Sequence, residues 1–524
     1  MPDKTTLEDS VVRLPDQFGT DPVTGLVTQA LEPADLDEEV TFLVSLHTSP
    51  GRRQELEARI ARGETVSPEE LADRYGAAAS RRARVRTWVQ SEGLTYDGES
   101  SDRSGIYVRG TVSDVARCLG VTFVRVIRDG ESYLAARDAP SVPSDLGDAV
   151  RAIVGLQPYR HPGKPKTARR RGHHSKATSS GYTVSQIAHA YGADQTGLTG
   201  SGQIIAILID TLPTDADVEQ FWKLNGITSD VSRVTKINVP GGTLPPVEGE
   251  ESLDVEWTSG LAVEADIRVY AAGGLDWVSL DKAIDRLITD FSAYPAMRQL
   301  SISLGLGETY MQSSAGEVDT QHTRFTNLAA LGINVFVASG DGGSNPDQSG
   351  GNSGPLQVDY AASDPSVIGV GGTSLTLDTT GEVVSETGWT DGGGGLSILF
   401  DRPAWQKATG LASGPKRAVP DISCTADPSP GGLMVVNGEA QPVGGTSWAT
   451  PVCAAFCALV NQARTAAGKA PLPALGPQLY PLQGTAALRD ITTGSNGAYH
   501  AGPGYDLVTG LGVFDVPGLV SALG

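Results

Sequence analysis

A serine lies in a short glycine-lined segment near the C-terminal end of the chain, residues 443–451, which reads VGGTSWATP. The apolar run AFCALV that follows predicts a buried helix, so Ser447 stands at the start of that helix. A serine hydroxyl is a weak nucleophile at its own pKa and needs a base beside it. The first question is therefore which side chain could take the proton of Ser447.

Histidine is the usual base at neutral pH, and the chain has seven. They fall in the N-terminal part and its linker, in helical runs and in a C-terminal turn: His47, His161, His173, His174, His189, His322 and His500. None follows a strand and opens a helix with glycine and a small residue, as a subtilisin-type histidine does. A histidine-dependent hydrolase is thus disfavoured, and activity at pH 8 would be its signature.

Carboxylates fit the role of the base better. The stretch EGEESLDVEWTSGLAVEADIRVY predicts a helix just before a strand. Glu250 and Asp254 are four residues apart and share one helix face, whereas Glu251 and Ser252 point elsewhere. Like charges at this spacing cost stability, so a mere surface helix gains nothing from them. Acidic surface helices are nevertheless common, and taken alone this pair favours such a helix over a functional site.

A third carboxylate ends a strongly apolar strand. Asp341 follows VFVASG and precedes two glycines, so it is expected to be partly buried within a glycine turn. Taken alone, this pattern favours a turn-forming aspartate.

Short β-branched runs alternate with helical stretches through the larger part of the chain, at 204–210, 267–272, 299–304, 333–339 and 367–372. Unbroken apolar strands separated by helices predict an α/β fold with a parallel sheet buried on both faces. In such sheets, sites form where the strands end at their carboxyl termini. Asp210, the segment 303–305 and Asp341 all stand at such ends.

The first 155 residues predict a separate α+β domain, an antiparallel sheet with helices on it. Residues 156–180 are rich in Pro, Gly, Ser and basic residues and predict an exposed, cleavable linker, with an ordinary interdomain connection as the alternative. Residues 1–177 carry 25 Lys and Arg against 26 Asp and Glu, whereas the remainder carries 15 against 35. The strongly acidic remainder argues against nucleic-acid binding.

Other features narrow the class of protein further. No run of about eighteen apolar residues predicts a membrane span. The four cysteines are too few for a disulfide scaffold, and Cys453 and Cys457 are expected to be small core residues. Neither CxxC nor HExxH occurs, so zinc is not expected. The N-terminus shows no ordinary secretion signal.

Together, GEESLDVE, SGDGG and GGTSWATP, in this order and at these intervals, resemble the sedolisin or serine-carboxyl peptidase family and its kumamolisin-like members. The resemblance covers nearly the whole chain, because the leader and linker resemble the family's activation domain. It implies a subtilisin-like peptidase domain at 181–524, preceded by a ferredoxin-like prodomain at 1–155 that acts as chaperone and intramolecular inhibitor. It also implies a zymogen of a serine endopeptidase that cuts its own prodomain at low pH.

The resemblance implies a role for each candidate residue. Ser447 is the nucleophile, Glu250 the general base and acid, and Asp254 orients Glu250 and shares a proton with it. Asp341 donates a hydrogen bond to the oxyanion, which it can do only while protonated. A general base works best when its pKa lies near the working pH, and the pKa of an unperturbed glutamate is ~4.3, so we expect activity at acid pH. A catalytically inactive, calcium-binding relative of the same fold is the alternative.

The tail LRDITTGSNGAYHAGPGYDLVTGLG concentrates oxygen ligands in glycine-rich turns, which suits a hard cation. The resemblance implies one structural Ca²⁺, held by the carboxylates of Asp490 and Asp506 and by the backbone carbonyls of Ile491, Gly502 and Gly504. His500 is a neighbour of these residues rather than a ligand. The ion would tie down the last loops and take no part in the chemistry.

Three positions concern the surroundings of the site. Ile209, next to Asp210, stands where an extra acid extends the hydrogen-bond chain in the family, and Leu304 stands where a tryptophan often covers it. These two departures are the features that favour the inactive alternative. Asp359 matches a specificity-pocket acid and implies a preference for basic side chains. Protein or peptide substrates, a monomer without membrane or nucleic-acid partners and an extracellular location complete the expectations.

Overall fold

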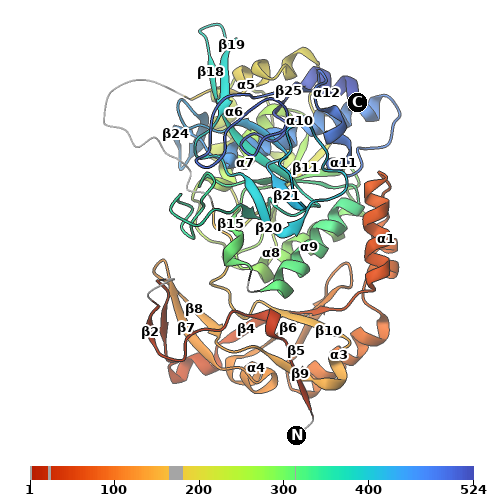
Figure 1. The fold of residues 1–524 in the computed structure, drawn as a ribbon, viewed down its shortest axis with the longest axis vertical. Coiled ribbons are helices and arrows are strands. Elements are labelled where there is room, and N and C mark those ends of the chain that lie inside the picture. The colour runs from red at the N-terminus through yellow and green to blue at the C-terminus, as the bar shows by residue number, and fades with distance from the viewer. Residues whose placement is uncertain (1–2, 22–24, 165–180, 313) are drawn as a thin grey trace.

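The computed structural model describes residues 3–21, 25–164, 181–312 and 314–524. Within them lie two domains, an N-terminal one in red and orange and a larger one that carries the rest of the chain (Figure 1). No helix in these ranges is long and apolar enough to cross a membrane. All four cysteines are buried and form no disulfide, and the prediction that Cys453 and Cys457 are small core residues is confirmed.

The N-terminal domain is built on a four-stranded antiparallel sheet. Its strands, in spatial order, are β10 (Val150–Val154), β4 (Glu39–Leu46), β6 (Gly105–Thr111) and β5 (Thr95–Glu99). Helix α3 (Ala79–Ser91) precedes β5 and α4 (Val112–Leu119) follows β6. In chain order the strands therefore run fourth, first, third, second, which is the ferredoxin-like arrangement. The predicted α+β domain is confirmed.

Smaller elements complete this domain. A second antiparallel sheet joins β2 (Gly19–Thr20), β3 (Val27–Gln29), β7 (Phe123–Arg128) and β8 (Glu131–Ala136), and β1 (Lys4–Thr6) pairs with β9 (Ser141–Pro143). Helices α1 (Pro50–Ala61) and α2 (Pro68–Glu70) connect β4 to α3.

A long, mostly parallel sheet forms the core of the larger domain. Seven of its parallel strands, in spatial order, are β12 (Val234–Asn238), β13 (Asp266–Ala271), β11 (Ile204–Ile209), β14 (Met297–Ile302), β16 (Asn334–Ala338), β18 (Ile368–Leu377) and β22 (Ile422–Thr425), and β26 (Val513–Phe514) pairs parallel with β22. The short β26 and β25 (Leu488–Arg489) extend it, and β19 (Val383–Gly388) forms a hairpin with β18. The five apolar runs correspond to β11, β13, β14, β16 and β18, so the predicted α/β fold is confirmed.

Two helix pairs cover this sheet. Helix α7 (Glu250–Leu261) packs against α10 (Thr446–Ala466), and α10 also contacts β14, β16, β18 and β22. Helix α8 (Trp277–Phe291) packs against α9 (Ala315–Ala330) and contacts β11 and β13. All five residues of β16 are buried, as expected of a strand covered on both sides.

The remaining elements are short and lie around this core. They are the helices α5 (Val184–Ala190), α6 (Asp215–Leu224), α11 (Gly476–Leu479) and α12 (Val516–Leu523), and the strand pairs β15 (Leu306–Gly307) with β17 (Asp359–Tyr360), β20 (Gly395–Asp401) with β21 (Lys416–Val419), and β23 (Gly432–Val436) with β24 (Glu439–Val443).

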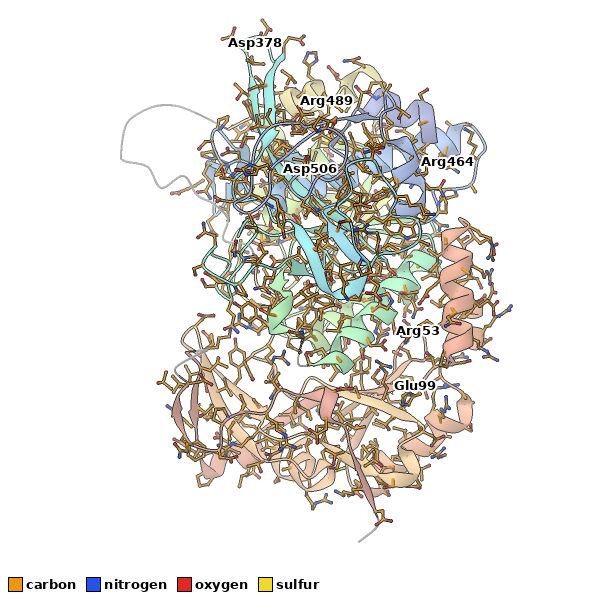
Figure 2. The ribbon with its side chains drawn as sticks, viewed as in Figure 1. Arg53, Glu99, Asp378, Arg464, Arg489 and Asp506 are labelled. Carbon is orange, nitrogen blue, oxygen red and sulfur yellow. The ribbon has the colours of Figure 1, made fainter. Side chains whose placement is uncertain are left out.

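The N-terminal domain rests on α8 and α9 (Figure 1). Strand β10 contacts α9, and β4 contacts α8. Helix α1 extends along the larger domain, where Arg53 Nη1 lies 2.6 Å from Asp319 Oδ1 of α9 (Figure 2). The α8–α9 pair thus carries the N-terminal domain, whereas α7 and α10 are available for a site.

The segment after β10 differs from expectation. Leu156, Gln157, Tyr159 and Arg160 are buried, and Leu156 and Tyr159 pack in apolar clusters of the N-terminal domain, so the exposure predicted for residues 156–180 is wrong for this part. Trp277 Nε1 donates to the carbonyl of Arg160 over 2.8 Å, which anchors the segment to α8. Residues 165–180, with the basic run, lie outside the described residues.

Candidate active site

Ser447 stands in the first turn of α10, as predicted. The β23–β24 hairpin leads into Gly445, whose φ of 123° is a conformation that favours glycine. A Cβ at Gly445 would lie 2.6 Å from Asp341 Oδ2, so the close approach of these two segments also requires glycine. Ser447 is 1% exposed, and its Oγ has no hydrogen-bond partner among the described residues.

Glu250 and Asp254 lie on α7, which faces α10. All twelve residues of α7 are buried, so the alternative of an acidic surface helix is wrong. Trp257 of α7 and Trp448 of α10 pack edge to face, with ring centroids 5.0 Å apart. This contact fixes the two helices beside each other and holds the acid pair in the same buried region as Ser447.

Ser303, which the sequence places at a strand end without indicating a role, connects these helices. Ser303 follows β14, and its Oγ donates to Asp254 Oδ1 over 2.7 Å and lies 3.4 Å from the carbonyl oxygen of Ser447. Its position at the carboxyl end of a central strand was the available signal. Ser303 fixes the orientation of Asp254, which leaves Asp254 Oδ2 and both oxygens of Glu250 buried without a partner among the described residues.

Burial controls the protonation of the acid pair. It raises the pKa of Glu250 well above the usual range, and the neighbouring Asp254 adds to this, whereas the Ser447 hydroxyl opposes it. Burial also raises the pKa of Asp254 to about 8, although the hydrogen bond from Ser303 opposes the rise. The pair therefore retains a proton far above the ~4.3 of an unperturbed glutamate. The pKa of ~4.3 expected from the sequence is therefore too low for Glu250, because desolvation raises it.

Asp341 lies on the loop after β16 and faces the start of α10. Its Oδ1 accepts hydrogen bonds from the Thr446 backbone N–H and hydroxyl, both over 2.8 Å, while Oδ2 is buried and unpartnered among the described residues. Burial raises its pKa to about 6, against the lowering effect of the Thr446 hydrogen bonds. Below that pH, Oδ2 carries a proton that it can donate.

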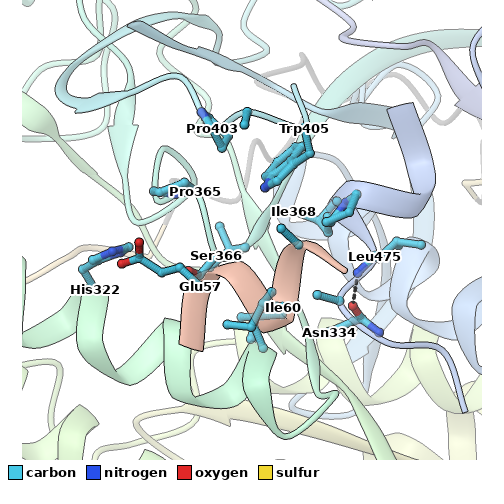
Figure 3. Close-up of a pocket in the computed structure, with 18 of the residues that line it drawn as sticks. Glu57, Ile60, His322, Asn334, Pro365, Ser366, Ile368, Pro403, Trp405 and Leu475 are labelled. Atoms are coloured by element: carbon cyan, nitrogen blue, oxygen red, sulfur yellow. Dashed lines mark hydrogen bonds between the residues drawn. The ribbon is translucent and has the colours of Figure 1, made fainter. Parts of the chain in front are cut away.

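A cavity of about 290 Å³ contains Asp341 and Asp359, together with residues of the N-terminal domain and the tail after it, among them Arg128 and His161. Asp359 is 7% exposed, and burial raises its pKa to about 8. A larger cavity of about 390 Å³ lies between α1 and the other domain, lined by Ile60, His322 and Trp405 (Figure 3). It contains none of the four candidate catalytic residues and is not the active site.

The histidines stay outside this arrangement. Of the five in the described residues, His189 pairs with Asp194 and Glu382, and His322 pairs with Asp364. His161 lines the cavity with Asp341 but belongs to the tail and contacts Tyr133. None of the hydrogen bonds or ion pairs formed by the described histidines reaches Ser447 or the acid pair. His173 and His174 lie outside the described residues.

The residues expected to bind calcium lie together. Asp506 Oδ2 accepts from the Gly502 N–H over 3.0 Å, and Asp490 Oδ2 accepts from the Gly504 N–H over 2.8 Å. Thr509 Oγ1 is 3.4 Å from the carbonyl of Ile491 and 3.3 Å from both oxygens of Asp506. No Lys or Arg among the described residues forms an ion pair with either carboxylate. Two uncompensated carboxylates among glycine-rich backbone fit a hard cation, although no group of three metal-binding side chains occurs in the described ranges.

Ile209 and Leu304, the two departures from the family pattern, are buried side chains near the site. Ile209 ends β11 fully buried, and Leu304 is 3% exposed beside Ser303. Neither displaces the four candidate catalytic side chains from the interface between α7, α10 and the β16 loop. Asp210, next to Ile209, faces the tail that follows the N-terminal domain.

Comparisons with known proteins point in one direction. The family described as "Pro-kumamolisin, activation domain" matches residues 29–159. Kumamolisin from Bacillus sp. (strain MN-32) is 31% identical over 519 residues, which cover 92% of this chain and 91% of that protein. Sedolisin from Pseudomonas sp. (strain 101) is 28% identical over 437 residues, covering 78% and 73%.

A solved structure agrees with these similarities. That of Pseudomonas sedolisin, a serine-carboxyl proteinase complexed with two molecules of pseudo-iodotyrostatin, superposes with a TM-score of 0.57 and 25% identity. The match covers 66% of this chain and 98% of that chain.

Proposed function

Because the chain belongs to the sedolisin family of serine-carboxyl peptidases and is a serine peptidase with an N-terminal activation domain, we propose that it is an acid-acting endopeptidase whose nucleophile is Ser447. Glu250 is its general base and acid, Asp254 orients Glu250, and Asp341 is the oxyanion donor. One observation carries this assignment. Ser447 Oγ, both oxygens of Glu250 and one oxygen each of Asp254 and Asp341 are buried without hydrogen-bond partners in the described residues. A buried polar group without a partner costs stability and needs an explanation. Because these groups belong to α7, the start of α10 and the loop after β16, which face one another, catalysis is the explanation that we propose for them.

In this mechanism the acid pair reacts in the form that holds one shared proton, on Asp254, so that Glu250 is ionised and takes the proton of Ser447 Oγ as this oxygen attacks the carbonyl carbon of the scissile bond. The developing oxyanion accepts a hydrogen bond from protonated Asp341 Oδ2, a contribution of ~3 kcal/mol to the transition state. Glu250 then gives the proton to the leaving amine, which leaves an acyl group on Ser447. In deacylation, Glu250 takes a proton from the water that attacks this ester and gives it to Ser447 Oγ as the acyl C–Oγ bond breaks, which releases the carboxylic acid product and restores the serine. Asp254, held by Ser303, stabilises each protonation state of Glu250 by sharing the proton.

The pKa of Asp341 sets the upper pH limit in this proposal. Activity requires the protonated form, so it is present below about pH 6 and is lost as the pH rises through that value. In Asp341→Asn, the amide oxygen can accept from Thr446 and the NH₂ group can donate at every pH. We expect its kcat/KM to stay level to a higher pH than that of the wild type, with a maximum within about tenfold of it. An unchanged alkaline limb in a pH–rate profile would show that Asp341 is not the donor.

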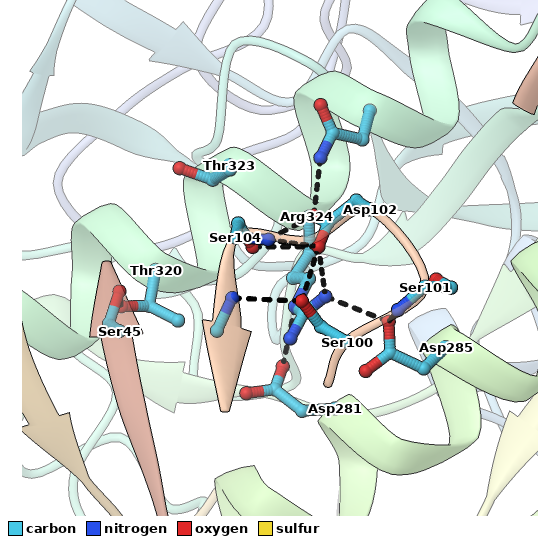
Figure 4. Close-up of polar contacts among 12 residues, drawn as sticks. Ser45, Ser100, Ser101, Asp102, Ser104, Asp281, Asp285, Thr320, Thr323 and Arg324 are labelled. Atoms are coloured by element: carbon cyan, nitrogen blue, oxygen red, sulfur yellow. Dashed lines mark hydrogen bonds and ion pairs between the residues drawn. The ribbon is translucent and has the colours of Figure 1, made fainter. Parts of the chain in front are cut away.

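The N-terminal domain acts as an intramolecular inhibitor in this proposal, since its tail enters the cavity that contains Asp341. Buried ion pairs hold the domain in place. Arg324 Nη1 of α9 is 3.1 Å from Asp102 of the N-terminal domain and 2.8 Å from Asp285 of α8 (Figure 4). Burial would raise the pKa of Asp102, but Arg324 and neighbouring hydrogen bonds lower it. Because that pKa is depressed, the stabilisation exists above about pH 4 and is lost as the pH falls below it.

A second such carboxylate offers a test of acid release. Asp319 of α9 lies 2.6 Å from both Arg53 and Arg151 of the N-terminal domain, which lower its pKa against the effect of burial. Asp319→Asn removes both pairs, so we expect the prodomain to be lost several-fold faster at pH 5. Asp378→Asn, in the β18–β19 hairpin away from the interface (Figure 2), is the matched control. Equal half-times for wild type and Asp319→Asn by intact mass would contradict this role.

We also propose one structural Ca²⁺ at the C-terminal loops. Asp490 and Asp506 would hold it, with the carbonyls of Ile491, Gly502 and Gly504, and it would neutralise a pair of carboxylates that have no cationic partner in the described residues. Since binding to the folded state stabilises by mass action, Ca²⁺ at about 100 times its Kd adds ~2.7 kcal/mol. Chelation should lower the Tm of the full chain, and Asp490→Asn should abolish the response. If the chelator changes the Tm of neither the wild type nor Asp490→Asn, the proposed calcium site is contradicted.

Acid action also supports an extracellular location, because the peptidase would be silent at neutral pH. The prediction is tested by comparing the culture medium with cell lysate for the mature protein.

A further inference from the structure

The tail that follows the N-terminal domain pairs with the larger domain at one isolated β-bridge. Gly163 pairs antiparallel with Gly305, and each donates its N–H to the carbonyl of the other, over 2.9 and 3.1 Å. Gly305 comes two residues after Ser303, which contacts Asp254. An extended peptide that adds to such an edge gains affinity from main-chain bonds and specificity from side-chain subsites. Residues 163 and 164 therefore bind as a peptide substrate could.

The side chain of Lys164 lies between two carboxylates of the larger domain. Its Nζ is 2.9 Å from Asp210 Oδ1 and 2.9 Å from Glu248 Oε2. The side chains of Lys164 and Asp210 are only 12% and 8% exposed, whereas that of Glu248 is 61% exposed. Burial alone would lower the pKa of Lys164, but the two carboxylates raise it. The ammonium group is thus enclosed on its inner side and open on its outer side.

Both carboxylates stay behind when the tail leaves. Asp210 directly follows β11, and Glu248 precedes Glu250 by two residues, so both are held by the elements that position the active site. Among the described residues, Lys164 is the one basic side chain that pairs with either of them. Nearby, Glu251 Oε2 is buried without a partner in the same part of the chain. Departure of Lys164 leaves a partly buried acidic pocket with no cation.

We propose that Asp210 and Glu248 form a subsite of the mature peptidase for a lysine or arginine side chain of the substrate, and that Lys164 occupies this subsite in the zymogen. This inference rests on the proposed function, because it names the class of peptide that the same site binds. It is separate from the specificity suggested for Asp359, which packs against the backbone of Gly305 and Gly340. Asp210, the residue after Ile209, therefore has a role in substrate binding in this proposal.

Internally quenched peptides test the subsite in the acid-activated enzyme. A neutral peptide is compared with variants that carry one Lys or one Met at each position in turn. At one position, Lys is expected to raise kcat/KM about tenfold over Met, mainly through KM. Asp210→Asn should reduce this preference below about twofold, with the rate on the neutral peptide nearly unchanged. Glu248→Gln should lose less, since its side chain is more exposed.

Asp359→Asn is the control that identifies the source of any preference. A lysine preference that survives in Asp210→Asn and disappears in Asp359→Asn would overturn the proposal, as would no preference at any position. Hydrolysis of the neutral peptide reports on the proposed function separately, because it does not depend on the subsite.

A second measurement needs no activity. In the full chain carrying Ser447→Ala, Lys164→Met and Asp210→Asn are compared singly and together by thermal unfolding at pH 7. If the pair forms, the double variant loses little more Tm than the larger single loss. Strictly additive losses would refute the pairing, whether or not the chain hydrolyses peptides. If no peptide is cut but the losses are coupled, the proposed function and the substrate subsite fail, and only the pairing of Lys164 with Asp210 stands.

Discussion

Ser447→Ala is expected to lower peptide hydrolysis at pH 4 by at least about 10⁴-fold and to leave the fold intact. The hydroxyl is the atom that forms the acyl bond, so nothing remains to attack the substrate except water. Its Oγ has no hydrogen-bond partner by geometry within the described residues, and the Glu250 pKa is the property that it affects, so we expect its removal to cost little stability. The rate is measured after the prodomain has been removed by added wild-type enzyme, because the variant would not process itself.

Ser252→Ala is the matched control for this experiment. Ser252 is also fully buried on the neighbouring helix α7 and also has an unpartnered hydroxyl in the described structure. We expect its activity to stay within about twofold of the wild type. Comparable activity in Ser447→Ala and wild type would refute the assignment of the nucleophile. Loss of activity in both variants would mean that buried hydroxyls matter here through folding.

Glu250→Gln is the second large effect and is expected to lower kcat by about 10³- to 10⁴-fold. The amide keeps the size and much of the polarity of the side chain, but it cannot take a proton from Ser447 or return one to the leaving amine. Since both oxygens of Glu250 lack partners in the described residues, the amide displaces no existing hydrogen bond. The measurement is kcat over pH 3 to 8, on enzyme freed of its prodomain in trans.

Glu256→Gln is the control that distinguishes the loss of a catalytic base from the replacement of a buried carboxyl group. Glu256 lies on the same helix, is fully buried, and burial raises its pKa well above the usual range, yet its Oε2 accepts from the Val435 N–H over 3.0 Å instead of facing the site. An amide oxygen can keep that bond, so activity should be retained. If Glu250→Gln and Glu256→Gln lose activity equally, Glu250 has no special role. If Glu250→Gln is active at pH 8, a histidine must be reconsidered.

Much of the fold and site could be predicted because the signals are local. The apolar runs that became β11, β13, β14, β16 and β18 carry their own burial pattern, and Ser447 is marked by the glycines before its helix. Glu250 and Asp254 are one helical turn apart, so their proximity follows from spacing alone. The pattern around Asp341, by contrast, favours a turn residue when taken alone. Its hydrogen bond from the Thr446 N–H shows that it faces the start of α10.

The parts that sequence reasoning missed depend on contacts between distant segments. Nothing around Ser303 indicates that it contacts Asp254, 49 residues earlier. The composition of the linker predicts exposure, but packing into the apolar clusters of the N-terminal domain overrides composition at Leu156 and Tyr159. The raised pKa values likewise come from burial, which requires the assembled helices α7 and α10.

An acid-activation time course tests the central claim most directly. The full-length chain and its Ser447→Ala variant are held at pH 4 and at pH 7, and intact mass is followed. We predict loss of the prodomain at pH 4 in the wild type, with no loss at pH 7 and none in Ser447→Ala at either pH. Loss of the prodomain from Ser447→Ala alone in solution, or wild-type processing that is as fast at pH 7 as at pH 4, would contradict an acid-acting serine-carboxyl mechanism.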